Sequence, residues 1–309
     1  MVRALTVITL CLLMTRAFGF EPGKVDFSIS FKGETSDYRV MSAFLQASEE
    51  FVFKINLPES EQIEISGQGD VVKEPGDRYR WNAPAHPGVS RLTIRRPSTG
   101  AQITLNLFVL VPANQVEEGM LNGYQIGHYP SEAYLNQAIY LPPPGYLEVT
   151  KDMLDIELTP NYRLEQFLCR QPSEFPKFLV LREKLLLKLE YLTEQVNVAG
   201  VPVSSFVIMS GFRTPYYNTS IRNAMYSRHQ WGGAADVFID EDPKDGKMDD
   251  LNKDGKVDKN DAEYLAQLIE QFAETPEYKS FIGGLGVYSA NSYHGPFIHV
   301  DVRGATVRW

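Results

Sequence analysis

The stretch Ser227-Arg-His-Gln-Trp-Gly-Gly-Ala-Ala-Asp236 decides how the second half of this chain folds. Its His229 and Asp236 stand on either side of two glycines and two alanines. These small residues allow the backbone to turn tightly, so the two side chains can meet at one point. The turn leads into an apolar run at 234–239, which we predict to be a strand.

A second stretch, His294-Gly-Pro-Phe-Ile-His-Val-Asp301, supplies the matching groups. His299 and Asp301 are two residues apart in a predicted strand at 297–302, so their side chains share one face while the apolar residues face a core. Zinc sites for hydrolysis take three protein ligands from His, Asp, Glu or Cys and keep a fourth position open. The two stretches therefore predict a zinc site, and the Gly-Pro turn can fold His294 over it.

Length and charge set the broad class of protein. A chain of 309 residues suits about two domains. Hydrophobic residues make up 43% of it and charged residues 22%, which leaves enough apolar material for two cores. The formal charge of −9 argues against nucleic acid as a partner, because phosphate backbones attract basic surfaces.

Residues 1–19 have the features of a secretory signal peptide: a basic start, an apolar run and the small-residue pattern Ala17-Phe-Gly19. The apolar run is short for a membrane span; a retained N-terminal anchor is the alternative. We expect an exported protein, periplasmic or secreted, with no integral membrane contact after signal removal. Cys11 leaves with the signal, so Cys169 remains alone and no internal disulfide is possible.

Short alternating runs between residues 20 and 112, such as Asp26-Phe-Ser-Ile-Ser-Phe31, predict β-strands. Gly, Pro, Asp and Asn separate them at turn positions. About six or seven strands in this length are typical of an all-β sandwich of immunoglobulin-like type. Residues 113–150 follow as a Pro-rich connector, because Pro142-Pro-Pro144 and other prolines prevent long regular elements and form a stiff spacer.

Residues 151–309 mix helix and strand and predict an α+β domain. The run 177–198 repeats apolar residues at helical spacing and ends at Gly200, a good stop for an amphipathic helix. Further strands are expected at 205–210 and 284–287, alongside those of the two stretches described first.

The pattern Ser-x-His-x6-Asp followed by His-x4-His-x-Asp, with an upstream Ser-Gly-Phe-Arg-Thr-Pro-x-x-Asn, resembles the zinc D-alanyl-D-alanine carboxypeptidase family of peptidoglycan peptidases. The resemblance covers roughly Val149 to Trp309. Carried over by position, it implies that His229, Asp236 and His299 ligate zinc.

The resemblance also implies roles for residues around the metal. His294 would lie beside the scissile carbonyl and stabilise the oxyanion. Arg213 would face the carboxylate of the substrate peptide, because a guanidinium matches that group with two parallel hydrogen bonds; a surface ion pair is its alternative role.

The general base is left open between two residues. In part of the wider superfamily a Glu stands three residues before the last His ligand, but here that position is Pro296, which takes no proton. Asp301 and His294 are the remaining candidates. A role for Asp301 behind a ligand, orienting it, is equally compatible with the sequence.

The acidic run at 240–261 contains a calcium loop of EF-hand or dockerin type, inserted in the zinc domain. Gly255 allows the sharp turn that brings carboxylates two residues apart onto one hard cation. Only one full loop is present and its twelfth position is Asp rather than the usual Glu, so we expect a stabilising ion before an exit helix at 262–272 rather than a sensor. A solvated acidic loop is the alternative. The predicted calcium ligands are Asp250, Asn252, Asp254, Lys256 through its carbonyl, Asp258 and Asp261.

These features predict an exported zinc metallopeptidase that cleaves peptide bonds of bacterial cell-wall peptidoglycan at D-amino acids. It would act as a DD-carboxypeptidase or as a cross-link endopeptidase, with peptidoglycan peptides as partners, and the β-sandwich would position it on the wall or a partner. The alternative is a non-catalytic wall- or protein-binding module that keeps zinc for structure. A fourth protein ligand would mark that alternative. The sequence sets no oligomeric state.

Overall fold

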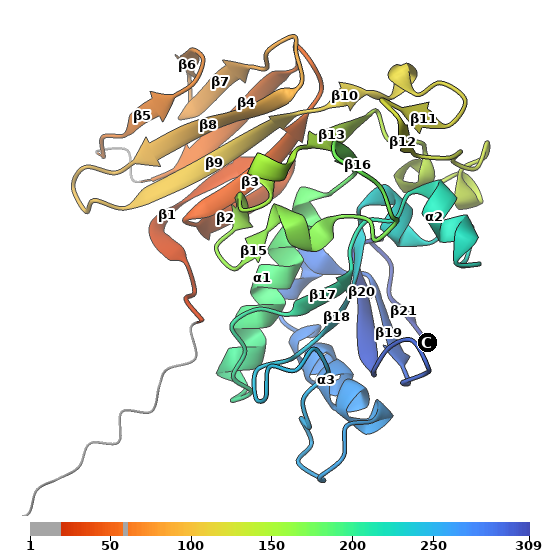
Figure 1. The fold of residues 1–309 in the computed structure, drawn as a ribbon. Coiled ribbons are helices and arrows are strands. Elements are labelled where there is room, and N and C mark those ends of the chain that lie inside the picture. Colours follow the sequence, from red (N-terminus) through yellow and green to blue (C-terminus); the bar gives the residue numbers. More distant parts are fainter. Residues whose placement is uncertain (1–19, 58–60) are drawn as a thin grey trace, which may run out of the picture.

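The computed structural model describes residues 20–57 and 61–309. The predicted signal peptide at 1–19 lies outside the described residues. Figure 1 shows a two-layered β unit built from the N-terminal residues, packed against a second unit of helices and sheet. No helix in the described part of the chain is long and apolar enough to cross a membrane.

The N-terminal strands, β1 to β9, form a β-sandwich of two sheets around one core. Residues from both sheets alternate into this core, as the period of a strand requires. Trp81 lies within it, 1% exposed, and its indole nitrogen donates to the carbonyl of Gln68 at 2.8 Å. One sheet has the order β2-β1-β4-β7-β6, with β1 (Lys24–Phe31), β2 (Glu34–Tyr38), β4 (Glu50–Asn56), β6 (Val71–Glu74) and β7 (Arg78–Asn82). The other has the order β3-β9-β8-β5, with β3 (Val40–Leu45), β5 (Glu64–Gly67), β8 (Gly88–Arg95) and β9 (Gln102–Val109).

The described residues of the sandwich form nine strands, more than the six or seven that alternation predicts. Strand β3 shows why. All six of its residues are buried, because Met41 and Leu45 face the sandwich core while Phe44 packs into the core of the second unit. A strand covered on both faces loses the alternation that identifies strands in a sequence.

The two units share their packing across a broad junction. Phe44 and Phe108 of the sandwich stack at 5.5 Å within the core of the second unit, and Leu187 of helix α1 (Glu183–Val198) belongs to the sandwich core. The hydroxyl of Ser42 donates to the carbonyl of Leu158 at 2.8 Å. The sandwich is therefore fixed against the second unit and is not a loosely tethered module.

Residues 113–150, predicted as a connector, are folded against their surroundings. Tyr216 donates its backbone N–H to the carbonyl of Ile126, and Tyr129 donates its hydroxyl to Gln230 at 2.7 Å, so the segment packs on the loops of the second unit. Its last residues belong to a sheet of order β10-β13-β16. The elements here are β10 (Val111–Pro112), η1 (Ala113–Gln115), β11 (Met120–Leu121), β12 (Tyr124–Gln125), η2 (Tyr134–Asn136), η3 (Ala138–Tyr140), β13 (Gly145–Val149) and β16 (Lys177–Leu179).

The helix that the sequence predicts from residue 177 begins only at Glu183. Residues 177–179 form β16 instead, and Leu179 pairs opposite Leu147 of β13. A short apolar run fits a covered strand as well as a helix, so spacing alone does not separate the two. Glu183 then occupies the first helical turn, where a negative side chain is favourable.

A five-stranded sheet of order β17-β18-β20-β19-β21 carries the candidate site. Helix α3 packs against β19 and β20 on one face and contacts α1. Val237, Ile298 and Val300 point into this core and are fully buried, while the polar residues between them face the other way. The strands are β17 (Val207–Ser210), β18 (Ala234–Phe238), β19 (Gly284–Tyr288), β20 (Phe297–Asp301) and β21 (Val307–Arg308), and the remaining elements are β14 (Glu157–Thr159), β15 (Tyr162–Arg163), η4 (Lys151–Met153), η5 (Leu164–Phe167), α2 (Pro215–Ser220), η6 (Arg228–Trp231), α3 (Lys259–Phe272) and η7 (Glu277–Phe281).

Candidate metal centre

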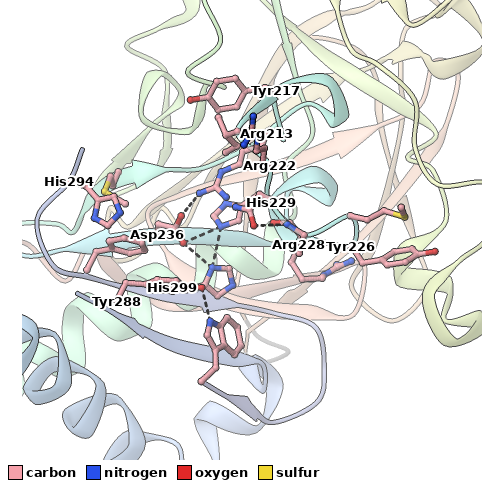
Figure 2. Close-up of a pocket in the computed structure, with 18 of the residues that line it drawn as sticks. Arg213, Tyr217, Arg222, Tyr226, Arg228, His229, Asp236, Tyr288, His294 and His299 are labelled. Carbon is pink, nitrogen blue, oxygen red and sulfur yellow. Dashed lines mark hydrogen bonds and ion pairs between the residues drawn. The ribbon is translucent and has the colours of Figure 1, made fainter. Parts of the chain in front are cut away.

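Three side chains from two adjacent strands and a short helix meet on the free face of the sheet (Figure 2). Asp236 on β18 stands directly opposite His299 on β20, so both side chains point the same way. His229 lies on η6, joined to β18 by a turn in which Gly232 has φ 62°. A Cβ at Gly232 would lie 2.2 Å from the carbonyl oxygen of Val180, so this turn requires glycine.

The three potential ligand atoms face one another closely. Nε2 of His229 is 3.1 Å from Oδ1 of Asp236 and 3.1 Å from Nδ1 of His299. Nδ1 of His299 is 2.9 Å from the same Oδ1. Tetrahedral zinc with bonds of about 2.0–2.1 Å places its ligand atoms about 3.3 Å apart. A small expansion of the triangle would therefore accommodate the ion.

The outer nitrogen of each histidine is held by a group that only accepts hydrogen bonds. Nδ1 of His229 is 2.7 Å from the carbonyl oxygen of Gly211, and Nε2 of His299 is 3.2 Å from Oδ2 of Asp301. Each outer nitrogen must carry the hydrogen, so the inner nitrogen of a neutral ring presents a lone pair. Two lone pairs and a carboxylate oxygen then converge on one point, which is the donor set of a cation site.

Burial and charge affect these groups in opposite directions. Burial lowers the pKa of His229, and Asp236 offsets this only in part. Burial alone would lower the pKa of His299 as well, but hydrogen bonds to Asp236 and Asp301 raise it overall. Burial would raise the pKa of Asp236, yet the two histidines hold it well below its usual range. A proton on His299 is thus the competitor that a metal ion must displace.

Asp301 lies behind His299 rather than in the pocket. It is fully buried, and Oδ1 accepts backbone hydrogen bonds from Gly284 at 2.8 Å and Arg303 at 3.0 Å. Burial would raise the pKa of Asp301, but hydrogen bonds from His299 and Arg303 keep it far below its usual range. This placement favours the orienting role and argues against Asp301 as the general base, because its oxygens are already occupied and face away from the pocket.

Trp309 forms a wall that sequence reasoning alone does not locate. Its ring lies 5.1 Å from the ring of His299 and over Gly286, which is the residue of β19 opposite His299. A Cβ at Gly286 would come within 2.5 Å of the indole. The indole nitrogen donates to the hydroxyl of Tyr288 at 2.6 Å, and the guanidinium of Arg303 stacks on the ring at 5.3 Å. The glycine-rich Gly283-Gly-Leu-Gly286 is the signal in the sequence that could reveal this slot.

Arg213 contacts a potential metal ligand in this structure, whereas the sequence predicts that it faces the carboxylate of the substrate. Its Nη2 donates to Oδ2 of Asp236, the oxygen that does not face the histidines, and its Nε donates to Ser210 at 2.7 Å. The side chain is 9% exposed. Arg213 therefore fixes the carboxylate of a potential ligand, and only its Nη1 makes no hydrogen bond within the described residues.

His294 lines the same pocket but makes no hydrogen bond to the three ligands in the described structure. Its Nδ1 is 2.8 Å from the carbonyl of Gly295, and its Nε2 is 2.8 Å from the amide nitrogen of Asn291. The carbonyl requires hydrogen on Nδ1, so Nε2 is the basic nitrogen. Apart from the three clustered side chains, His294 is the one histidine or carboxylate that lines this pocket among the described residues.

The pocket around the cluster is large and rich in aromatic side chains. Its volume is about 1380 Å³, above the usual range of roughly 300–1,000 Å³ for small-molecule sites. The segment 113–150, predicted as a connector, contributes Tyr134 and Tyr140 to the lining of this pocket, which the sequence did not indicate. The aromatic residues in the lining are Tyr134, Tyr140, Tyr217, Tyr226, Tyr288, Tyr293, Phe297 and Trp309.

The acidic run between β18 and α3 forms two consecutive turns with one hydrogen-bonding pattern. The carboxylate of Asp250 accepts backbone hydrogen bonds from Asp254 at 3.1 Å and Gly255 at 2.8 Å. Asp240 accepts in the same way from Gly246 at 2.9 Å. The two loops are thus folded by their own carboxylates, and Gly255 with φ 85° makes the sharp turn that the sequence predicts.

Asp261, the predicted twelfth calcium ligand, is fully buried and closes the loop from the inside. Its carboxylate accepts from the backbone of Leu251 at 2.8 Å, Asn252 at 3.2 Å and Asp258 at 2.8 Å, and so caps α3. In the described chain, the carboxylates of this loop do not form a group of three within 4.8 Å, whereas the three residues of the metal centre do.

Comparisons with known proteins add little to this geometry. No protein-family model and no curated protein matches the chain. Among solved structures, the crystal structure of the titin M3 domain matches with 14% identity over 27% of this chain and 97% of that chain, at a TM-score of 0.19. A similarity at that TM-score carries no argument about fold or function.

Proposed function

We propose that this protein is a zinc-dependent peptidase that cleaves peptide bonds of bacterial cell-wall peptidoglycan at D-amino acids. One observation carries the proposal: His229, Asp236 and His299 present three electron-rich atoms 2.9–3.1 Å apart, with the tautomer of each histidine set from behind. The sequence resemblance to zinc D-alanyl-D-alanine carboxypeptidases supplies the substrate class. A bound zinc ion would act as a Lewis acid that activates water and polarises an amide carbonyl.

The protein side chains hold and orient this centre. Asp301 and the carbonyl of Gly211 keep the inner nitrogens of the two histidines free of hydrogen, and Arg213 neutralises the outer oxygen of Asp236. Trp309 shields one side of His299. Such preorganised surroundings allow strong electrostatic interactions because they need no rearrangement during the reaction.

His294 is the group best placed to move a proton or to hydrogen-bond a developing oxyanion. It is partly exposed, it lines the pocket, and its Nε2 has a lone pair that faces only an amide group. Both roles are available to one imidazole, since it accepts a proton as a base and donates it later as an acid. We therefore propose His294 rather than Asp301 as the general base.

The proposal also assigns roles to three other parts of the chain. The segment at 1–19 would export the protein to the periplasm or the exterior. The sandwich, fixed against α1, would hold the pocket at a constant orientation relative to the wall. The loop at 250–261 would bind calcium and order the insertion before α3.

The alternative, a binding module with structural zinc, would need a fourth protein ligand. The pocket residues of the described structure offer no fourth carboxylate, cysteine or histidine within the cluster. An open coordination position favours catalysis over structure.

Digestion of purified peptidoglycan tests the proposal. The zinc-loaded protein and its His229→Ala variant are incubated with peptidoglycan of several peptide chemotypes, and soluble fragments are identified by mass spectrometry. We expect new peptide termini only with the zinc-loaded parent protein. Absence of any zinc-dependent product from every chemotype, in a protein that holds zinc at this site, would favour the binding module.

A further inference from the structure

The charges that line the pocket contrast with those of the whole chain. The chain carries a formal charge of −9. Among the lining residues that the structure describes, however, the acidic side chain is Asp236, one of the potential metal ligands, and the basic ones are four arginines. A cleft lined by one sign of charge attracts ligands of the opposite sign. The pocket is therefore suited to an anionic group on its substrate. The four arginines are Arg213, Arg222, Arg228 and Arg303.

Three of these arginines are already engaged. Arg213 is bound to Asp236, and Arg303 is bound to Asp301 through its Nε at 2.8 Å. Arg228 is 1% exposed, donates to the carbonyl of Ile139 at 2.8 Å and stacks on an aromatic ring. Burial lowers the pKa of Arg228 to about 10. The Nε and Nη2 atoms of Arg228 make no hydrogen bond within the described residues, but they are buried. None of the three arginines therefore presents an exposed and unpaired guanidinium to a ligand.

Arg222 is the exception. It follows helix α2 and is exposed, and in the described part of the chain no ion pair or side-chain hydrogen bond engages it. Its backbone has φ 54°, a conformation that residues other than glycine rarely adopt, and its N–H donates to the carbonyl of Thr219 at 2.9 Å. Strained backbone of this kind persists where the surroundings impose it and often occurs at binding sites. Figure 2 draws Arg222 on the same side of the cluster as Arg213 and Tyr217.

We propose that Arg222, rather than Arg213, binds a carboxylate of the peptide substrate and so determines specificity for acidic peptides. This inference rests on the proposed peptidase function and names the group that recognises its substrate. A guanidinium binds a carboxylate through two parallel hydrogen bonds, and an unpaired guanidinium at the edge of a pocket has two of its nitrogens available for them. Arg213 remains a positioning residue for Asp236.

Peptide binding and cleavage by an Arg222→Met variant test this inference. The probes are a synthetic stem pentapeptide ending in D-Ala-D-Ala, the same peptide amidated at its C-terminus, and the same peptide amidated at its glutamate. Dissociation constants are measured with metal-free protein, which leaves the peptides intact, and kcat and KM are measured with zinc-loaded protein. Arg95→Met is the matched control, since Arg95 is an exposed arginine of the sandwich strand β8. Arg222→Lys keeps the charge and removes the fork.

We expect Arg222→Met to weaken binding of the free-acid peptide about ten- to a hundredfold, with kcat nearly unchanged, because charged hydrogen bonds are of that strength. One of the two amidated peptides should bind the parent protein equally weakly and be insensitive to the variant, which identifies the carboxylate. Arg222→Lys should be intermediate, and Arg95→Met should equal the parent. If Arg222→Met lost affinity equally for all three peptides, or lost affinity for none of them, the inference would be overturned. If Arg222→Met cleaved the peptide as well as the parent protein does, only the role of Arg222 would be wrong. If binding depended on Arg222 but no peptide were cleaved, only the peptidase proposal would be wrong.

Discussion

Asp301→Asn replaces one carboxylate oxygen by an amide NH2 group. It should impair metal binding because it changes the tautomer of His299. Oδ1 of Asp301 accepts two backbone N–H groups, from Gly284 at 2.8 Å and Arg303 at 3.0 Å, whereas Oδ2 accepts from the side chain of Arg303, which can move away. We therefore expect the amide oxygen in the place of Oδ1. The amide nitrogen then takes the place of Oδ2, which is 3.2 Å from Nε2 of His299. An amide nitrogen only donates, so it forces the hydrogen of His299 onto Nδ1, the atom that faces Asp236.

The size of the effect follows from these contacts. Loss of the hydrogen-bond partner behind a ligating histidine typically costs about 10–100-fold in metal affinity. Here the substitution also favours the wrong tautomer, so we expect the zinc dissociation constant to rise about a hundredfold, which corresponds to about 3 kcal/mol. The guanidinium of Arg303 loses its charged partner as well, so the metal-free protein should also become less stable.

The assay separates these two consequences. Zinc affinity is measured by competition with a chromophoric chelator, and the free energy of unfolding of the metal-free protein by urea denaturation. Glu190→Gln is the matched control: Glu190 is a carboxylate that is 1% exposed, does not line the pocket, and is bound to the backbone and side chain of Asn161 at 2.7 Å. It should lose stability and keep the parent zinc affinity. A zinc affinity of Asp301→Asn within about twofold of the parent protein would refute the reasoning.

Three further predictions concern other parts of the chain. Gly286→Ala should displace Trp309, because the new Cβ would lie 2.5 Å from the indole; tryptophan fluorescence should then lose its quenching by bound Co²⁺, and an unchanged fluorescence response would contradict the contact. Calcium added to the zinc-loaded protein should raise its melting temperature and leave its zinc content unchanged, and Asp250→Ala should abolish the rise; equal melting temperatures with and without calcium would remove the calcium loop. Burial lowers the pKa of Lys188 to about 7. Between pH 7 and pH 10 the unfolded chain therefore binds more protons at Lys188 than the folded protein does, and the folded protein gains stability as the pH rises. The stability of Lys188→Met relative to the parent should therefore fall by about 1–3 kcal/mol between pH 7 and pH 9, as followed by urea denaturation, and a difference independent of pH would argue that Lys188 stays charged.

Much of the architecture around the cluster follows from local rules in the sequence. Alternation in Phe297-Ile-His-Val-Asp301 places His299 and Asp301 on one face, and the glycine turn before β18 brings His229 to the same place. The β-sandwich follows from short alternating runs with turn residues between them. Local rules suffice there because each pattern reports the burial of its own strand.

The remaining features depend on contacts between distant segments. Strand β3 is covered on both faces, so its sequence does not alternate. The pairing of β16 with β13 turns an apolar run into a strand, although its spacing also fits a helix. The contact of Arg213 with Asp236 depends on the register of β17 and β18, and no sequence motif predicts that register. Trp309 reaches His299 only because two glycines of β19 leave room for its ring.

The coordination shell of bound zinc tests the central proposal most directly. X-ray absorption at the zinc edge should show two imidazole nitrogens and oxygen donors at about 2.0–2.1 Å, no sulfur, and one exchangeable position that a hydroxamate inhibitor can occupy. His229→Ala and Asp236→Ala should each lose the ion. A shell completed by four protein ligands, or zinc retained unchanged in both variants, would contradict a catalytic centre at this site.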